Sequence, residues 1–102
     1  MARKTPEGRF KEELSADIMR LLPGCVILKN DEQLLQGVPD MLILWETHWA
    51  MLEVKKSRYA AMQPNQDYWI ERFDQMSFGA FVYPENKEVI LRALQSAFGI
   101  GR

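Results

Sequence analysis

The sequence predicts an α/β protein with the element order α-β-β-β-α-β-α, in which helices flank a mixed central sheet. Three observations lead to this fold class. Apolar residues near the N-terminus recur at helical spacing, short apolar runs in the middle of the chain have the length of strands, and a helix–strand–helix pattern follows them. A chain of 102 residues with 47% hydrophobic residues is large enough for one hydrophobic core, so we expect a single domain over residues 1–102.

The first predicted helix covers residues 6–22. Its start is indicated by Thr5-Pro6, because Thr caps the first turn of a helix and Pro is tolerated at the first helical position. Pro23-Gly24 ends it. The apolar residues that define one face of this amphipathic helix are Phe10, Leu14 and Ile18.

Three strands are predicted next. The β-branched run 25–28 forms the first, and the near-continuous apolar run 41–45 predicts a second strand that is buried on both faces. The third strand, 49–55, follows after the short connection 46–48. So short a connection favours an antiparallel hairpin between the second and third strands.

The last third of the chain predicts a helix, a strand and a second helix. Asn65 is expected to cap the first of these helices, and Gly79 to end it. Residues 80–83 form the fourth strand, which Pro84 interrupts. Asn86 is expected to cap the final helix.

The composition excludes several classes of protein. Thirteen Lys and Arg residues against 14 Asp and Glu leave a formal net charge of −1, which excludes a uniformly basic nucleic-acid binder but not a protein that acts on nucleic acid. A single Cys excludes a disulfide framework and a multi-cysteine zinc site. No apolar run approaches the roughly 20 residues of a membrane span, and the charged N-terminus has no signal core. We therefore expect a cytoplasmic protein with no membrane partner.

Two acidic residues fall at neighbouring points of the predicted hairpin. Asp40 begins one strand and Glu53 lies near the end of its partner, so both carboxylates should meet at one edge of the sheet. Lys55 points to the same face as Glu53, because residues two apart on a strand share a face. Two carboxylates and an ammonium suit a Mg²⁺-assisted attack on a phosphodiester. The alternative is a solvated cross-strand ion pair.

Three short motifs stand in the order and context of a known nuclease family. They are Gly37-Val38-Pro39-Asp40 before one strand, Glu53-Val54-Lys55 at the end of the next, and Gln63-Pro64-Asn65-Gln66 at the start of a helix. From about Glu12 to Tyr83 the sequence resembles the VRR-NUC branch of the PD-(D/E)xK nucleases, and in particular its small stand-alone members. The resemblance implies a restriction-endonuclease-like core.

The resemblance also implies roles for five residues of these motifs. Asp40, Glu53 and the backbone carbonyl of Val54 would bind Mg²⁺ or Mn²⁺. Lys55 would be the catalytic lysine, and Gln66 would orient groups at the scissile phosphate.

Further residues lie outside the motifs. The resemblance further implies that Glu13 reaches the metal directly or through water, with Glu12 as its competitor because helix phase does not separate the two. The stretch 54–66 contains three basic residues and no acid, so it could hold backbone phosphates, although a solvated loop is the alternative. The expected nucleic-acid contacts are Lys29, Lys56, Ser57 and Arg58. A basic N-terminal arm, which either follows DNA or is disordered, comprises Arg3, Lys4, Arg9 and Lys11.

The resemblance to the small members of this family implies a homodimeric, Mg²⁺- or Mn²⁺-dependent endonuclease that hydrolyses branched DNA, four-way (Holliday) junctions in particular. A two-fold dimer presents two sites to opposing strands. Two alternatives stay open: a flap or duplex nuclease of the same superfamily, and a non-catalytic DNA-binding module. The large apolar and aromatic residues that predict a subunit interface are Trp45, Trp49, Tyr59, Met62, Tyr68 and Trp69.

Overall fold

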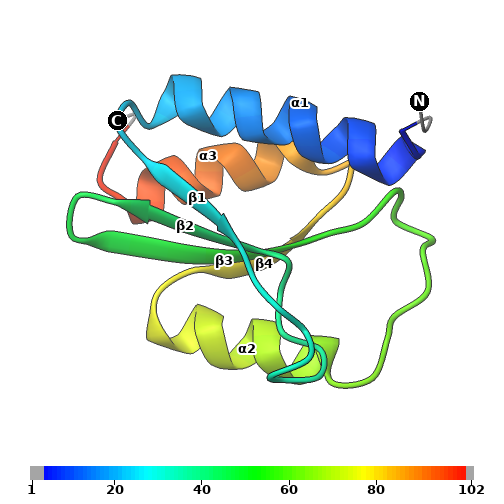
Figure 1. Ribbon diagram of the computed structural model, residues 1–102. Coiled ribbons are helices and arrows are strands. Elements are labelled where there is room, and N and C mark those ends of the chain that lie inside the picture. The colour runs from blue at the N-terminus through cyan, green and yellow to red at the C-terminus, as the bar shows by residue number, and fades with distance from the viewer. Residues whose placement is uncertain (1–3, 101–102) are drawn as a thin grey trace.

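The computed structural model describes residues 4–100 and confirms the predicted order of elements. Figure 1 shows a sheet between two helical layers, with α1 and α3 on one face and α2 on the other. Within the described chain, no helix combines the length and apolar character needed to cross a bilayer. The elements are α1 (Pro6–Leu21), β1 (Val26–Lys29), β2 (Met41–Trp45), β3 (His48–Val54), α2 (Gln66–Met76), β4 (Gly79–Val82) and α3 (Lys87–Ala97).

The sheet is mixed, with the strand order β1-β2-β3-β4. β2 pairs antiparallel with both β1 and β3, whereas β3 and β4 are parallel and are connected through α2. In the β2–β3 hairpin Met41 lies opposite Leu52. This register places Asp40, which directly precedes β2, beside Glu53 near the end of β3.

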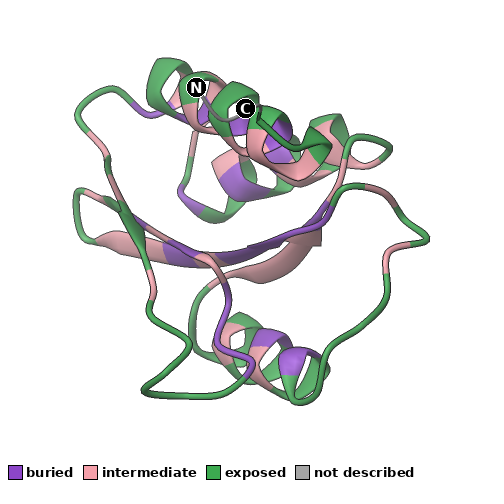
Figure 2. Cartoon of the chain, turned by 45° about the vertical axis from the view of Figure 1, so that its right-hand side comes forward, coloured by how far each residue is buried: buried purple, intermediate pink, exposed green. Residues whose placement is uncertain are grey.

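One hydrophobic core lies between the sheet and the layer formed by α1 and α3. Phe10, Leu14 and Ile18 of α1 are buried in it, as their spacing predicts. Figure 2 shows buried segments along the middle of the sheet and on the helices that face it. Burial of these side chains supplies the main favourable free energy of folding. The other members are Leu22, Met41, Ile43, Ala50, Leu52, Val54, Val82, Leu91, Leu94 and Phe98.

The outer face of β1 and β2 differs from the predicted burial. Leu44 is 38% exposed, and its cross-strand neighbour Val26 is 49% exposed, so β2 is buried fully on one face only. Leu28 on β1 is likewise 45% exposed. The reason is that α2 packs on β3 and β4 and leaves this half of the sheet uncovered.

Gly79 begins β4, whereas the sequence predicts that it ends α2. The helix ends at Met76. A Cβ atom at Gly79 would lie 2.7 Å from the carbonyl oxygen of Ile70. The glycine is therefore needed for the close approach of α2 to β4 rather than for the end of the helix.

The predicted helix caps are confirmed for α1 only. The Thr5 hydroxyl accepts a hydrogen bond at 3.0 Å from a backbone amide of the first turn. Asn65 and Asn86 stand at the N-cap positions of α2 and α3, but neither side chain caps its helix. Asn65 instead adopts a left-handed φ of 69°, which Asn tolerates better than most residues. The Asn86 side chain closes the turn after β4, where it accepts from the amide of Tyr83 at 2.9 Å.

Candidate active site

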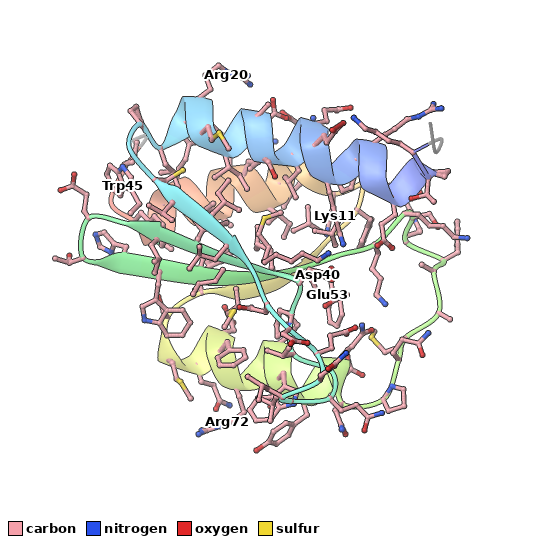
Figure 3. All side chains as sticks on the ribbon, viewed as in Figure 1. Lys11, Arg20, Asp40, Trp45, Glu53 and Arg72 are labelled. Atoms are coloured by element: carbon pink, nitrogen blue, oxygen red, sulfur yellow. The ribbon has the colours of Figure 1, made fainter. Side chains whose placement is uncertain are left out.

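Asp40 and Glu53 meet where the start of β2 lies beside the end of β3 (Figure 3). The backbone N–H of Asp40 donates to Oε1 of Glu53 at 3.2 Å, and the N–H of Val54 donates to Oδ2 of Asp40 at 2.9 Å. Each carboxylate is thus held by the main chain of the opposite strand. Glu53 is 4% exposed, whereas the Asp40 side chain is 19% exposed. The pair therefore opens to solvent on the side of Asp40.

Gln66, the first residue of α2, connects Glu53 to Lys55. Its Nε2 donates to Oε2 of Glu53 at 3.1 Å, and its Oε1 accepts from Nζ of Lys55 at 2.7 Å. Nζ of Lys55 also donates to the carbonyl oxygen of Ala61 at 3.0 Å. Gln66 and Lys55 are both buried, at 3% and 8% exposure. Buried polar groups in such a network hold one another in place, because losing a partner costs each of them its desolvation energy.

The Glu53 carboxyl is in an unfavourable environment for a negative charge. Burial raises the pKa of Glu53 to about 8, and the neighbouring Asp40 carboxylate adds to the rise, whereas Lys55 opposes it. A cation between the two carboxylates would offset both the burial and the repulsion. The site therefore favours a positively charged partner.

The loop that precedes Asp40 is held against the start of α2. Gly37 has a φ of +84°, and a Cβ atom there would lie 2.6 Å from the carbonyl oxygen of Pro64. Val38 and Pro39 are buried, and Nδ2 of Asn30 donates to the carbonyl oxygen of Pro39 at 2.8 Å. The loop that ends in Asp40 thus packs on the residues that precede Gln66, and this contact positions Asp40 next to the start of α2.

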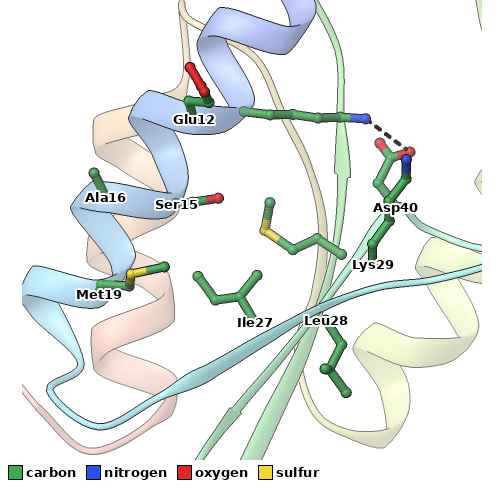
Figure 4. Close-up of a pocket in the computed structure, with 10 residues that line it drawn as sticks. Glu12, Ser15, Ala16, Met19, Ile27, Leu28, Lys29 and Asp40 are labelled. Carbon is green, nitrogen blue, oxygen red and sulfur yellow. Dashed lines mark ion pairs between the residues drawn. The ribbon is translucent and has the colours of Figure 1, made fainter.

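Lys11 of α1 is a further member of the site, although the sequence indicates it only as part of a basic arm. Its Nζ lies 3.5 Å from Oδ1 of Asp40, an ion pair drawn as the dashed line in Figure 4, and 3.4 Å from Oε2 of Glu7. In the sequence, the only sign of these ion pairs is the four-residue spacing of Glu7 and Lys11, which is typical of an ion pair within one helix. It shows that the two side chains are neighbours on the helix, but not that they face β2.

The structure separates the two glutamates that helix phase left unresolved. The expectation that Glu13 reaches the carboxylate pair does not fit its position, because Glu13 faces α3, is 64% exposed and pairs with Nζ of Lys87 at 2.9 Å. Glu12 lies on the other side of α1, where it pairs with Lys4 and lines a groove that ends at Asp40. Of the two, Glu12 is the one on the side of Asp40.

The residues expected to contact nucleic acid lie on two sides of the site. Lys29 ends β1 and lines the groove beside Asp40. Lys56 and Arg58 are exposed on the loop after β3, and Arg58 lies over the ring of Tyr59 at 5.7 Å. Ser57 is half-buried, and its hydroxyl accepts from the Tyr59 amide at 3.2 Å, which shapes the loop. Of the N-terminal arm, Arg3 lies outside the described residues, and Lys4 and Arg9 are exposed.

The donor set of the site fits a magnesium-type ion. Magnesium is usually bound through one or two carboxylates, with water and substrate phosphates as its other ligands. Asp40 and Glu53 supply these two carboxylates side by side, and Val54 adjoins them through its bond to Asp40. No group of three or more His, Cys, Asp and Glu side chains suited to a metal occurs within residues 4–100. A site built on two carboxylates is therefore what the structure offers.

Two solved structures with a similar fold are described as VRR_NUC domains. One, described as a VRR_NUC domain, matches with a TM-score of 0.70 and 24% sequence identity, covering 86% of this chain and 96% of the other. A second, described as a VRR_NUC domain protein, matches with a TM-score of 0.57 and 16% identity, covering 98% of this chain and 93% of the other. No protein-family model and no curated protein matches the sequence. The structural matches confirm the fold that the sequence resemblance implied.

Proposed function

We propose that this chain is a VRR-NUC nuclease, a metal-dependent endonuclease that hydrolyses phosphodiesters in branched DNA such as four-way junctions. The observation that carries the proposal is the buried network that joins Asp40, Glu53, Gln66 and Lys55. The VRR_NUC fold of the chain supports a nuclease in general. The preference for branched DNA comes from the sequence resemblance to small members of that family.

Asp40 and Glu53 would hold the divalent ion, Mg²⁺ or Mn²⁺, with the backbone carbonyl of Val54 as a third ligand. Bound there, the ion would act as a Lewis acid on the scissile phosphate. The surroundings of Glu53 favour this role, because its burial and the nearby Asp40 carboxylate destabilise the charged form in the absence of a cation. Glu13 is omitted from the proposed ligands because of its ion pair with Lys87.

Lys55 would contact the phosphate on which negative charge develops. Its ammonium group has three N–H donors, of which Gln66 and the carbonyl oxygen of Ala61 accept two. The third N–H remains for a phosphate oxygen, and both existing acceptors are uncharged, so the positive charge is not neutralised by a direct ion pair. Gln66 holds the ammonium at a set position relative to Glu53. A preorganised donor of this kind stabilises a developing oxyanion more than a mobile one does.

The exposed basic residues beside Lys55 would hold neighbouring backbone phosphates. Lys56 and Arg58 follow Lys55 on the same loop and point to solvent. Phosphate contacts of this kind position a duplex without reading its sequence. This agrees with an enzyme that selects DNA by its shape.

A homodimer is part of the proposal, since two sites related by a two-fold axis would act on opposing strands of a junction. The uncovered outer face of β1 and β2 supports it. Val26, Leu28 and Leu44 place adjoining exposed apolar side chains there, a feature that is typical of protein–protein contacts.

The proposal is tested by incubating a labelled four-way junction and a linear duplex of the same sequence with the protein, with and without Mg²⁺. We expect Mg²⁺-dependent nicking of the junction, and its loss in Asp40→Asn, Glu53→Gln and Lys55→Met. Glu71→Gln is the matched control, because Glu71 is exposed on α2 and away from the network. Circular dichroism melts would show that each variant is folded. Full activity in all three site variants would refute the proposed site.

Two outcomes would point to the alternatives. Equal cutting of the linear duplex, or faster cutting of a flap substrate, would indicate another nuclease of the same superfamily. A folded protein that binds DNA, shows no Mg²⁺ binding by calorimetry and cuts no substrate would indicate a non-catalytic binding module.

A further inference from the structure

A groove beside Asp40 lies outside the network proposed to carry out the reaction (Figure 4). It runs between α1 and β1 and has a volume of about 540 Å³. Cavities that bind small organic molecules typically measure about 300–1,000 Å³. Asp40 and Lys11 form one end of the groove, so it is continuous with the proposed metal site.

The walls of the groove are mostly apolar. Ile27 of β1 points toward α1, whereas Leu28 points away, as Figure 4 shows. Met41 of β2 and Met19 of α1 add further apolar surface, and Ser15 points into the groove from the helix. Flat aromatic groups are accommodated well by methionine and aliphatic side chains.

Basic residues lie at the end of the groove near Asp40. Lys29 shares the face of β1 with Ile27, because the two are separated by one residue, and it therefore points toward α1. None of the ion pairs formed within residues 4–100 includes Lys29. Lys11 pairs with Asp40 and Glu7, and its ammonium group has three N–H donors, so one of them remains for another anion. The groove thus combines an apolar wall with two ammonium groups next to the site, and its two carboxylates, Asp40 and Glu12, are paired with Lys11 and Lys4.

We propose that the groove receives one unpaired nucleotide adjacent to the scissile phosphate, with its base against Ile27 and Met19 and its phosphates at Lys11 and Lys29. This inference rests on the proposed function and deepens it. A paired base is stacked inside the duplex and cannot enter such a groove without being extruded. The free-energy cost of extrusion is smallest for a base that is already unpaired or poorly stacked. The groove would therefore favour DNA at a branch point or a frayed end over continuous duplex.

The charge pattern favours a nucleotide over other occupants. An apolar peptide would cover the apolar wall but would leave the charge of Lys29 without a partner. A nucleotide matches both parts, because its base has apolar faces and its phosphates are anionic. The position next to Asp40 also places that nucleotide directly beside the bond to be cut.

The test measures how much a single base contributes to binding. The first step is to map the bond that the wild-type protein cuts in a four-way junction in the presence of Mg²⁺. Dissociation constants are then measured by fluorescence anisotropy, without divalent ions, for the intact junction and for junctions that lack the base on either side of that bond. Ser15→Phe fills the groove, and Ser96→Phe is the matched control on an exposed position of α3.

We expect that removing the base on one side weakens binding by wild type and by Ser96→Phe about tenfold, the usual effect of losing one base stacked on a protein. Ser15→Phe should bind the intact junction about as weakly as wild type binds the junction without that base, and removing the base should then have no further effect. A tenfold effect of the base that persists in Ser15→Phe would overturn the proposal, as would the absence of any base effect in wild type.

The outcomes also separate this proposal from the proposed function. If wild type cuts no DNA, the nuclease assignment fails and the groove loses its role with it. If wild type cuts junctions with Mg²⁺ but shows no dependence on the flanking base, only the role of the groove is refuted. If Ser15→Phe changes the sedimentation mass from dimer to monomer while Ser96→Phe does not, the groove is an interface between copies and the nucleotide proposal is wrong.

Discussion

Replacement of Glu53 by glutamine should stabilise the metal-free protein, and the gain should grow with pH. Folding raises the pKa of the Glu53 carboxyl from its ordinary value of 4.5 to about 8, mainly through burial and the nearby Asp40 carboxylate. Between these two pH values the folded protein holds a proton that the unfolded chain has lost. Stability therefore falls as pH rises through this window, because unfolding releases that proton and its release becomes more favourable at higher pH.

The size of the effect follows from the width of the window. Each pH unit over which the two states differ by one proton changes the free energy of unfolding by ~1.4 kcal/mol. From pH 4.5 to about 8 the total is on the order of 4–5 kcal/mol, a large part of the ~5–15 kcal/mol by which a small domain is stable. Glutamine keeps the shape of the side chain and does not titrate, so this loss is absent from the variant.

The measurement is urea unfolding of wild type and Glu53→Gln in EDTA at pH 5, 6, 7 and 8, with Glu71→Gln as an exposed control on α2. We expect the free-energy difference between Glu53→Gln and wild type to increase by several kcal/mol from pH 5 to pH 8, and that of Glu71→Gln to stay constant. Addition of Mg²⁺ at pH 8 should stabilise wild type more than the variant, because only wild type keeps both carboxylates. A difference that does not change with pH would refute the assignment of a destabilised charge at Glu53.

Three further predictions concern the network, the loop and the opposite side of α1. Gln66→Met should lower the free energy of unfolding by about 2–4 kcal/mol, because Oε2 of Glu53 and Nζ of Lys55, both buried, each lose the hydrogen bond that they make to the Gln66 amide; an unchanged urea midpoint would contradict this. Gly37→Ala should cost more than Gly24→Ala, since both have a φ of +84° but only the Gly37 methyl would meet backbone, at 2.6 Å; equal losses in thermal melts would show that the close approach does not matter. Lys87 and Arg20 lower the pKa of Asp17, and Asp17 raises that of Lys87. The pair should therefore stabilise the fold at neutral pH. This stabilisation should be lost below pH 3.8, as Asp17 is protonated, and above pH 10.5, as Lys87 is deprotonated. Lys87→Met should flatten the acid limb of a curve of stability against pH.

The hairpin and its carboxylates were predictable because they depend on contacts that are close in sequence. The short connection between β2 and β3 leaves little freedom in how the two strands pair, so Asp40 had to come close to Glu53 once both strands were identified. Gln66 was identified by resemblance rather than by pattern. Its bonds to Glu53 and Lys55 bring a helix start against a strand end, and nothing in local spacing predicts this.

The sequence-based predictions are wrong at positions whose role depends on how distant elements pack against each other. Gly79 has the usual features of a helix stop, yet its role is to let α2 approach β4. The apolar run of β2 predicts burial on both faces, but α2 is placed over β3 and β4, so Leu44 remains partly exposed. In both cases the neighbour that determines the outcome is distant in sequence.

By itself, the sequence determined the order of the elements, the face of α1 that enters the core and the meeting of Asp40 with Glu53, because each follows from periodicity or from a short connection. Only the tertiary structure decided which flank of α1 faces the carboxylates. Lys11 and Glu13 lie on opposite sides of the apolar stripe of that helix, and the stripe alone does not say which side borders β1 and β2 and which borders α3. The packing of α1 on the sheet beside α3 brings Lys11 to Asp40, turns Glu13 to Lys87 and leaves the groove beside the site.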